Sequence, residues 1–285
     1  MKLQKLGEEQ RTQLAQFLEQ RPDTTMFLRA NLQRGGIEYH GQTLQAEYWG
    51  LFDASGELVG VTAHAWNGSL LLDGRDQTAT LLAQLAPHLN RPIQGLTGVW
   101  DEVVTARAVL GLNDRATTLE SCEDLMSLPL EQLRLPESLR RGDVCYRRSQ
   151  DDDVPLLQRW RSAYAVETLG AEAGPETDQK SAEGVLRAHH QNDLWVLESE
   201  GELVAMTAFN ARLDDCVQVG GVFTPKDLRC QGYGRGVVAG SLQDVHAEGV
   251  GRALLFTENP WARRAYEALG FEVVGDYGLV FFATE

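Results

Sequence analysis

The chain carries the stretch Arg229-Cys230-Gln231-Gly232-Tyr233-Gly234-Arg235-Gly236, between a predicted strand at residues 217–223 and a predicted helix at residues 234–248. Gly232 and Gly234 have no side chain that would keep a large anion away from the backbone. The predicted helix points its free N–H groups and the positive end of its dipole toward the same place. Together these features predict a binding site for a pyrophosphate group.

The spacing of the glycines separates this loop from two better-known phosphate-binding loops. It follows neither the G-x-G-x-x-G pattern of dinucleotide-binding folds nor the G-x-x-x-x-G-K-[ST] pattern of P-loop proteins. It has the pattern R-x-x-G-x-G. Taken alone, the loop is also compatible with a tight turn between a strand and a helix that binds nothing.

A second motif follows the loop. The segment from Asn259 to Phe271 has the sequence N-P-W-A-R-R-A-Y-E-A-L-G-F. Asn259 is a favourable residue at a helix N-cap, Pro260 suits the first helical position, and Gly270 suits the position just after a helix. By itself the segment predicts a short, well-capped helix.

In this order the two motifs resemble the GNAT superfamily of acetyl-CoA-dependent N-acetyltransferases. In that superfamily R-x-x-G-x-G is the pyrophosphate loop and N-x-x-A-x-x-x-Y-x-x-x-G-F is a second signature, every named position of which is filled here. The resemblance is specific over residues 190–275 and diffuse over the first 140 residues. It is closest to the two-domain, tandem GNAT-like proteins of bacteria.

The resemblance implies acetyl-CoA as the co-substrate and assigns roles to residues around the loop. The backbone N–H of Val222 would donate to the thioester carbonyl, and Tyr266 would be the general acid, since a phenol keeps its proton at neutral pH. Alternatives are that Tyr266 only packs on the sheet and that Asn259 only caps its helix. The residues implied to bind the cofactor are Val222, Phe223, Thr224, Arg229, Cys230, Gln231, Gly232, Tyr233, Gly234, Arg235 and Asn259.

The acceptor is expected to be the primary amine of a small molecule or of a protein lysine. Glu167 and Glu176 belong to an acidic segment that shapes the acceptor entrance in relatives, and this acidity would suit an ammonium group. Gln218, on a central strand, is a third candidate for contacting the acceptor. The general base stays open between a strand carboxylate and a water relay.

Composition restricts the class of protein. The 285 residues suggest two domains, and 43% hydrophobic with 24% charged residues is typical of soluble globular proteins. The net charge of −15 argues against a nucleic-acid partner, and no apolar run is long enough to cross a membrane. Four widely spaced cysteines indicate free, buried thiols in a reducing compartment, so we expect a cytoplasmic protein without a bound metal. The sequence does not determine whether it forms oligomers.

The two halves of the chain have similar patterns. Gly56-Glu57-Leu58-Val59 is matched by Gly201-Glu202-Leu203-Val204. Ala106-Arg107-Ala108-Val109-Leu110-Gly111-Leu112 is matched by Ala265-Tyr266-Glu267-Ala268-Leu269-Gly270-Phe271 in the second motif. This order predicts an α/β protein with two GNAT-like domains, each a mixed, mostly antiparallel sheet flanked by helices. We expect a degenerate domain at residues 1–140 without the R-x-x-G-x-G loop, acting as a scaffold or substrate wall. Residues 141–285 would be the catalytic domain, after a linker near residues 135–143.

Two other functions remain compatible with these motifs. The chain could be a regulatory module that binds acyl-CoA without turnover, although such a module would not need Tyr266. It could also be a transferase that uses a longer acyl-CoA or an aminoacyl carrier. The predicted loop recognises the diphosphate and not the acyl group, so the sequence leaves the donor open.

Overall fold

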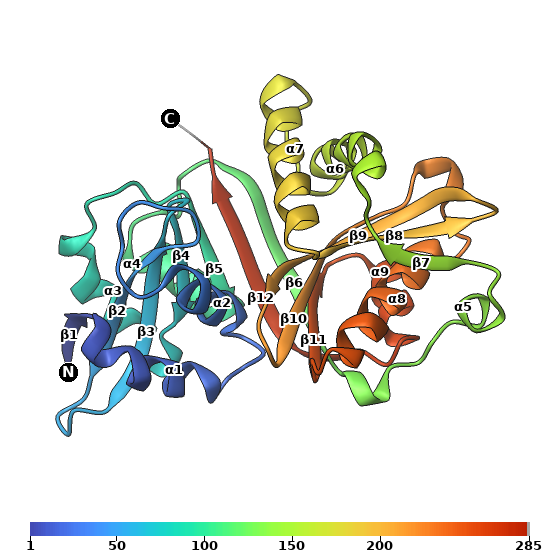
Figure 1. Cartoon of the computed structure of the whole chain (residues 1–285). Coiled ribbons are helices and arrows are strands. Elements are labelled where there is room, and N and C mark those ends of the chain that lie inside the picture. The colour runs from blue at the N-terminus through green and yellow to red at the C-terminus, as the bar shows by residue number, and fades with distance from the viewer. Residues whose placement is uncertain (284–285) are drawn as a thin grey trace. The chain divides into compact units, whose positions relative to one another are not determined.

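A computed structural model describes residues 1–283 (Figure 1). The strands in this part of the chain are β1 (Lys2–Lys5), β2 (Ala46–Phe52), β3 (Leu58–Ala65), β4 (Ser69–Asp73), β5 (Gly95–Val99), β6 (Thr117–Pro129), β7 (Cys145–Arg148), β8 (Leu194–Ser199), β9 (Glu202–Arg212), β10 (Cys216–Phe223), β11 (Arg252–Thr257) and β12 (Glu272–Phe282). The helices are α1 (Arg11–Glu19), α2 (Met26–Gly35), α3 (Thr78–Leu85), α4 (Trp100–Val109), α5 (Glu137–Arg141), α6 (Val154–Thr168), α7 (Pro175–His190), α8 (Tyr233–Ala247) and α9 (Pro260–Glu267).

The chain divides into two compact units. The first combines Met1–Leu125 with the chain from Gly275 onward, and the second is Met126–Val274. These limits differ from the expected domains 1–140 and 141–285. The expected linker forms α5 and packs on the second unit, because Leu133, Leu135 and Leu139 contact its hydrophobic core. The last strand, β12, begins in the second unit and ends in the first.

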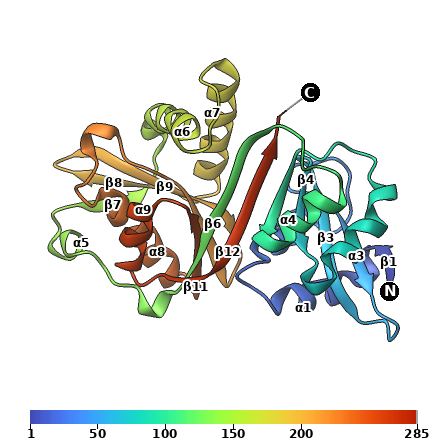
Figure 2. The ribbon, with the colours of Figure 1, turned by 180° about the vertical axis from the view of Figure 1, so that it is seen from behind.

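The first unit has helices on both faces of its sheet. Its strand order is β1-β2-β3-β4-β5-β12-β6, with β4 and β5 parallel and β1–β4 otherwise antiparallel. Residues of α1 and α2 share one core with Tyr48, while residues of α3 and α4 share another with Leu70. The two helix pairs therefore cover opposite faces, as Figures 1 and 2 show from the two sides.

The second unit repeats this plan. Its strand order is β6-β11-β10-β9-β8-β7, with β10 and β11 parallel and β7–β10 antiparallel. Along β8, Trp195 and Leu197 pack against α8, whereas Leu194 and Val196 pack against α6 and α7. This alternation is the period-2 pattern of a strand that is buried on both faces. The expected mixed, mostly antiparallel sheet with flanking helices is thus confirmed in each unit.

The predicted repeat matches the backbone at its glycines. Gly56 and Gly201 both have positive φ, 88° and 84°, immediately before β3 and β9. Gly111 and Gly270 also have positive φ, 66° and 106°, after α4 and α9. Such values are adopted easily only by glycine, so the same turn chemistry occurs at equivalent places in the two units.

Three observations concern the expectations drawn from composition. In the described part of the chain, no helix is both long and apolar enough to cross a membrane. All four cysteines are free, but only Cys216 is buried. The expectation of buried thiols is therefore wrong for Cys122 and Cys145, whereas Cys230 belongs to the glycine-rich loop and is exposed. Residues 1–283 contain no group of three or more His, Cys, Asp or Glu side chains placed to hold a metal ion.

Candidate active site

The site is built around an irregularity in β10. Its parallel register with β11 covers Cys216, Val217 and Gln218 and, within the described residues, ends there. On the other side, the pairing of β10 with β9 is irregular between Gly220 and Phe223, and Gly221 has a φ of +59°. The end of β10 that includes Val222 therefore extends beyond the parallel ladder with β11.

The glycine-rich loop has the backbone conformation that the sequence required. After a 3₁₀ turn at Lys226–Leu228, Gly232 is the N-cap of α8 with a φ of +81°. A side chain there would be strained even though space is available, because the nearest atom to an added Cβ is 3.7 Å away. The first helical bond runs from Gly236 N–H to the Gly232 carbonyl, 2.9 Å, so the earlier N–H groups of α8 stay available to an anion.

The loop brings the strand end and the first turn of α8 together. A Cβ added to Gly234 would lie 3.5 Å from Oγ1 of Thr224 and 3.7 Å from Cγ1 of Val222. Phe223 is buried in the core beneath α6, and Val222 and Tyr233 are partly buried against the opposite core. Gln231 accepts a hydrogen bond from the Tyr233 hydroxyl at 3.3 Å, and Cys230 is exposed with a φ of +64°.

The two loop arginines have different surroundings. The Arg229 guanidinium donates to the Thr224 carbonyl at 2.9 Å and to a Glu167 carboxylate oxygen at 2.7 Å, so its charge is already paired. Arg235 has Nη2 3.7 Å from the position of a Cβ on Gly232, and its buried Nε has no protein partner within residues 1–283. Arg235 is therefore the loop arginine whose charge is available to a phosphate.

Tyr266 and Asn259 both lie on α9. The Asn259 side chain accepts from the backbone N–H groups of Trp261 and Ala262 at 2.9 and 3.3 Å, so its capping role is confirmed. Tyr266 is partly buried against the same core as Val222, with its ring 6.0 Å from that of Phe271. Burial, and next the proximity of Tyr164, raise the pKa of Tyr266 above its usual value. Its hydroxyl therefore keeps its proton throughout the neutral range.

The three residues expected to contact the acceptor, Glu167, Glu176 and Gln218, each already have a bonding partner within the protein. Glu167 pairs with Arg229 and, at 3.4 Å, with Lys226, and the hydrogen bond from Arg229 lowers its pKa. Glu176 is exposed and pairs with Lys180 one turn away in α7, at 2.7 Å. Gln218 is 2% exposed and donates to the Val219 carbonyl at 2.6 Å. The negative charge at Glu167 and Glu176 is thus largely neutralised by neighbouring cations.

Arg161 and Tyr164 on α6 belong to neither of the two sequence motifs, yet Arg161 lies beside β10. Leu157, Arg161 and Tyr164 are spaced i, i+4 and i+7, so the arginine lies on the helix stripe that faces the sheet. Nη1 of Arg161 is 3.3 Å from the position that a Cβ on Gly221 would take. A charged residue on an otherwise apolar stripe was the signal in the sequence that could have identified it.

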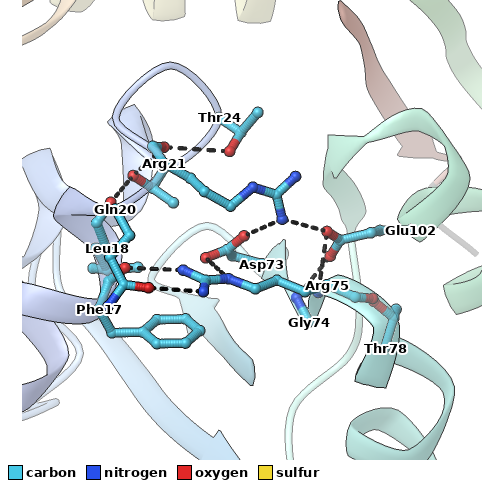
Figure 3. A network of polar contacts seen from close by, with 11 residues as sticks. Phe17, Leu18, Gln20, Arg21, Thr24, Asp73, Gly74, Arg75, Thr78 and Glu102 are labelled. Atoms are coloured by element: carbon cyan, nitrogen blue, oxygen red, sulfur yellow. Dashed lines mark hydrogen bonds and ion pairs between the residues drawn. The ribbon is translucent and has the colours of Figure 1, made fainter. Parts of the chain in front are cut away.

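At the equivalent place in the first unit, a side chain of the protein accepts the hydrogen bonds of the backbone N–H groups (Figure 3). The loop after β4 is short, and a carboxylate oxygen of Glu102 on α4 accepts from Gly74 N–H at 2.7 Å, while the other accepts from Arg75 N–H at 3.3 Å. Arg21 lies between Asp73 and Glu102, at 3.1 and 3.7 Å. The Glu102 carboxylate thus accepts hydrogen bonds from these N–H groups of the first unit. The N–H groups at the equivalent place in the second unit would face a phosphate.

Comparison with known proteins agrees with this geometry. Residues 156–271 match the family model described as the acetyltransferase (GNAT) family. No curated protein matches the chain.

Solved structures that resemble the chain share its two-unit extent. One is an acetyltransferase from the GNAT family of Colwellia psychrerythraea, with 15% identity, a TM-score of 0.55, and coverage of 99% of this chain and 100% of that one. A tandem GNAT protein from the clavulanic acid biosynthesis pathway has 13% identity, a TM-score of 0.55, and coverage of 99% and 98%. A protein from Drosophila has 11% identity, a TM-score of 0.67, and coverage of 99% and 98%. At these identities the likeness shows a common fold.

Proposed function

We propose that this chain, in which residues 156–271 form a GNAT acetyltransferase domain, transfers acetyl from acetyl-CoA to a primary amine by direct attack in a ternary complex. The observation that carries the proposal is the end of β10, where Val222 extends beyond the ladder with β11 directly before the glycine-rich loop and α8. Acetyl-CoA would supply an acyl group activated as a thioester. The acceptor would be a small molecule or a protein lysine.

The loop would bind the diphosphate of acetyl-CoA. The backbone N–H groups from Gln231 to Arg235 would donate to its oxygens, together with the positive end of the α8 dipole. The Arg235 guanidinium, whose charge has no acidic partner among the described residues, would add a charge-assisted contact. Arg229 would instead hold the loop to α6 through Glu167.

The chemistry would need two protein groups close to the thioester. The acceptor nitrogen forms a bond to the thioester carbon while the carbon–sulfur bond breaks, and the ammonium proton goes to water. Val222 N–H would donate to the carbonyl oxygen as negative charge develops there, which is typically worth about 3 kcal/mol. Tyr266 would give its proton to the departing thiolate and then regain one from water; its raised pKa keeps the hydroxyl protonated in the free protein.

The remaining assignments belong to the same proposal. Glu167, Glu176 and Gln218 stay candidates for contacting the acceptor, although the two carboxylates are paired with cations. The first unit would serve as a scaffold or substrate wall. Four free cysteines fit a reducing compartment and support action in the cytoplasm.

The test is a calorimetric titration of acetyl-CoA into the wild-type protein and the Gly232→Glu variant, followed by a screen of amines for release of CoA thiol. We expect saturable binding by the wild type and none by Gly232→Glu, because a carboxylate would face the diphosphate. Gly174→Glu is the matched control, since Gly174 lies outside the loop and an added Cβ there meets nothing within 4 Å. Normal binding by Gly232→Glu would show that the loop is assigned wrongly, and binding without turnover of any amine would favour a regulatory module.

A further inference from the structure

Arg161 reaches the centre of the candidate site from α6. Its Nη1 is 3.3 Å from where a Cβ on Gly221 would lie, in the irregular part of β10 next to Val222. Its guanidinium carbon is 4.9 Å from the ring centroid of Tyr164, which is also close enough to raise the pKa of Tyr266. Arg161 therefore lies beside the end of β10 that includes Val222 and against Tyr164.

The charge of Arg161 has no acidic partner. Within residues 1–283 no carboxylate forms an ion pair with it, whereas Arg147, Arg212 and Arg229 in the same unit each pair with at least one. Burial lowers its pKa, the positive charge of Arg187 on α7 lowers it further, and the nearby Tyr164 opposes these effects. A guanidinium stays charged in proteins, so this arrangement is costly for the free protein.

We propose that Arg161 binds a carboxylate of the acceptor, so that the substrate is an amino acid or a similar molecule carrying both a primary amine and a carboxylate. A bidentate contact between guanidinium and carboxylate would neutralise the half-buried charge and fix the direction of the amine. The site lies beside the thioester end of the strand, whereas the diphosphate would be held by the loop and Arg235. This inference rests on the proposed function.

The experiment compares matched acceptors with the wild type and with variants of Arg161. The acceptors are the twenty L-α-amino acids, each measured against its carboxamide by release of CoA thiol at saturating acetyl-CoA. A carboxamide has the less basic amine, so it would be the faster acceptor if the carboxylate did not matter. We expect wild-type kcat/KM for the best amino acid to exceed that of its carboxamide by about tenfold or more.

Arg161→Gln should abolish this preference. It should lower kcat/KM for the amino acid by about 10- to 100-fold, chiefly through KM, and bring the ratio of acid to amide close to one. Arg161→Lys should keep part of the preference, because the charge remains. Arg159→Gln is the matched control, since Arg159 is an exposed arginine of the same helix that donates to the Pro155 carbonyl.

The outcomes distinguish this inference from the proposed function. A wild type that acetylates carboxamides as well as amino acids, or an Arg161→Gln variant that loses both activities equally, overturns the carboxylate site. Binding of acetyl-CoA without acetylation of any amino acid also overturns it. Absence of acetyl-CoA binding by the wild type instead overturns the proposed function itself. Circular dichroism and the thermal midpoint of each variant establish that it is folded.

Discussion

At the scale of single residues, the packing of α9 determines the environment of Tyr266, the proposed general acid. Its position in the second motif follows from the sequence, but its environment comes from α9 packing against the core that also contacts Val222. Burial raises the pKa of Tyr266 because the phenolate would lose its hydration. The hydroxyl can therefore act as a proton donor at neutral and at moderately alkaline pH.

Tyr266→Phe should lower kcat by roughly 100-fold, the usual size of general-acid catalysis, and leave the affinity for acetyl-CoA nearly unchanged. Since the pKa of Tyr266 is raised, ionisation of this group should cause no fall in wild-type kcat between pH 7 and pH 9. The measurement is a pH profile of kcat for both proteins, with calorimetry for binding. Tyr146→Phe, which removes a hydroxyl bonded to Gln243, is the control. An unchanged kcat in Tyr266→Phe would remove Tyr266 from the mechanism.

At the scale of elements, a carboxylate joins β7 to the start of α6. Asp153 accepts from both terminal nitrogens of Arg147, at 2.6 and 3.1 Å, and from Gln150 N–H at 2.7 Å. Burial alone would raise the pKa of Asp153, but the hydrogen bonds from Arg147 and Gln150 outweigh it and hold the pKa below its usual value. This clamp fixes the beginning of the helix that carries Arg161 and Tyr164.

Asp153→Asn should destabilise the protein at pH 7 by about 2 kcal/mol, the value of hydrogen bonds to a charged group. Because the native pKa is lowered, the unfolded state binds more protons, and the contribution is present above the unfolded pKa of about 4 and lost as pH falls through the native value. The thermal midpoints of variant and wild type should therefore converge below about pH 4. Asp152→Asn, at the exposed neighbour, is the control. A difference that does not shrink as the pH falls below about 4 would mean that packing, and not charge, is responsible.

At the scale of the whole molecule, the two units have the same architecture but differ in one loop, which precedes α3 in the first unit and α8 in the second. In the second unit, α8 begins at a glycine-rich loop with free N–H groups. In the first unit, the N–H groups of Gly74 and Arg75 donate to Glu102, and Arg21 links that carboxylate to Asp73 (Figure 3). Because these donors are already bonded within the protein, we expect the first unit not to bind a phosphate at this place.

We expect one equivalent of acetyl-CoA per chain, bound by the second unit. Calorimetry of the wild type measures the stoichiometry. Hydrogen exchange, compared with and without acetyl-CoA, locates the binding site by the amides that the ligand protects. Protection should appear at the start of α8 and not at the start of α3. Two equivalents, or protection near Gly74, would show that the carboxylate of Glu102 can be displaced.

Much of the fold was predictable because the signals are local. The strand and helix around the loop, the cap at Asn259 and the repeated positive-φ glycines depend on neighbouring residues. The limits of the units were not predictable. Residues 126–140 join the second unit because their leucines complete its core, a contact between residues far apart in the chain.

The sequence by itself determined the GNAT-type loop and signature, since glycine spacing and capping are encoded within a few residues of each other. Only the tertiary structure decided which charges are available. Arg229 and Arg235 look equivalent in the sequence. In the structure Glu167 pairs with Arg229, whereas Arg235 has no acidic partner among the described residues. Arg161 lies beside β10 on α6 and has no acidic partner within residues 1–283. Charge pairing depends on distances of a few ångströms between separate elements, and the order of residues along the chain does not specify them.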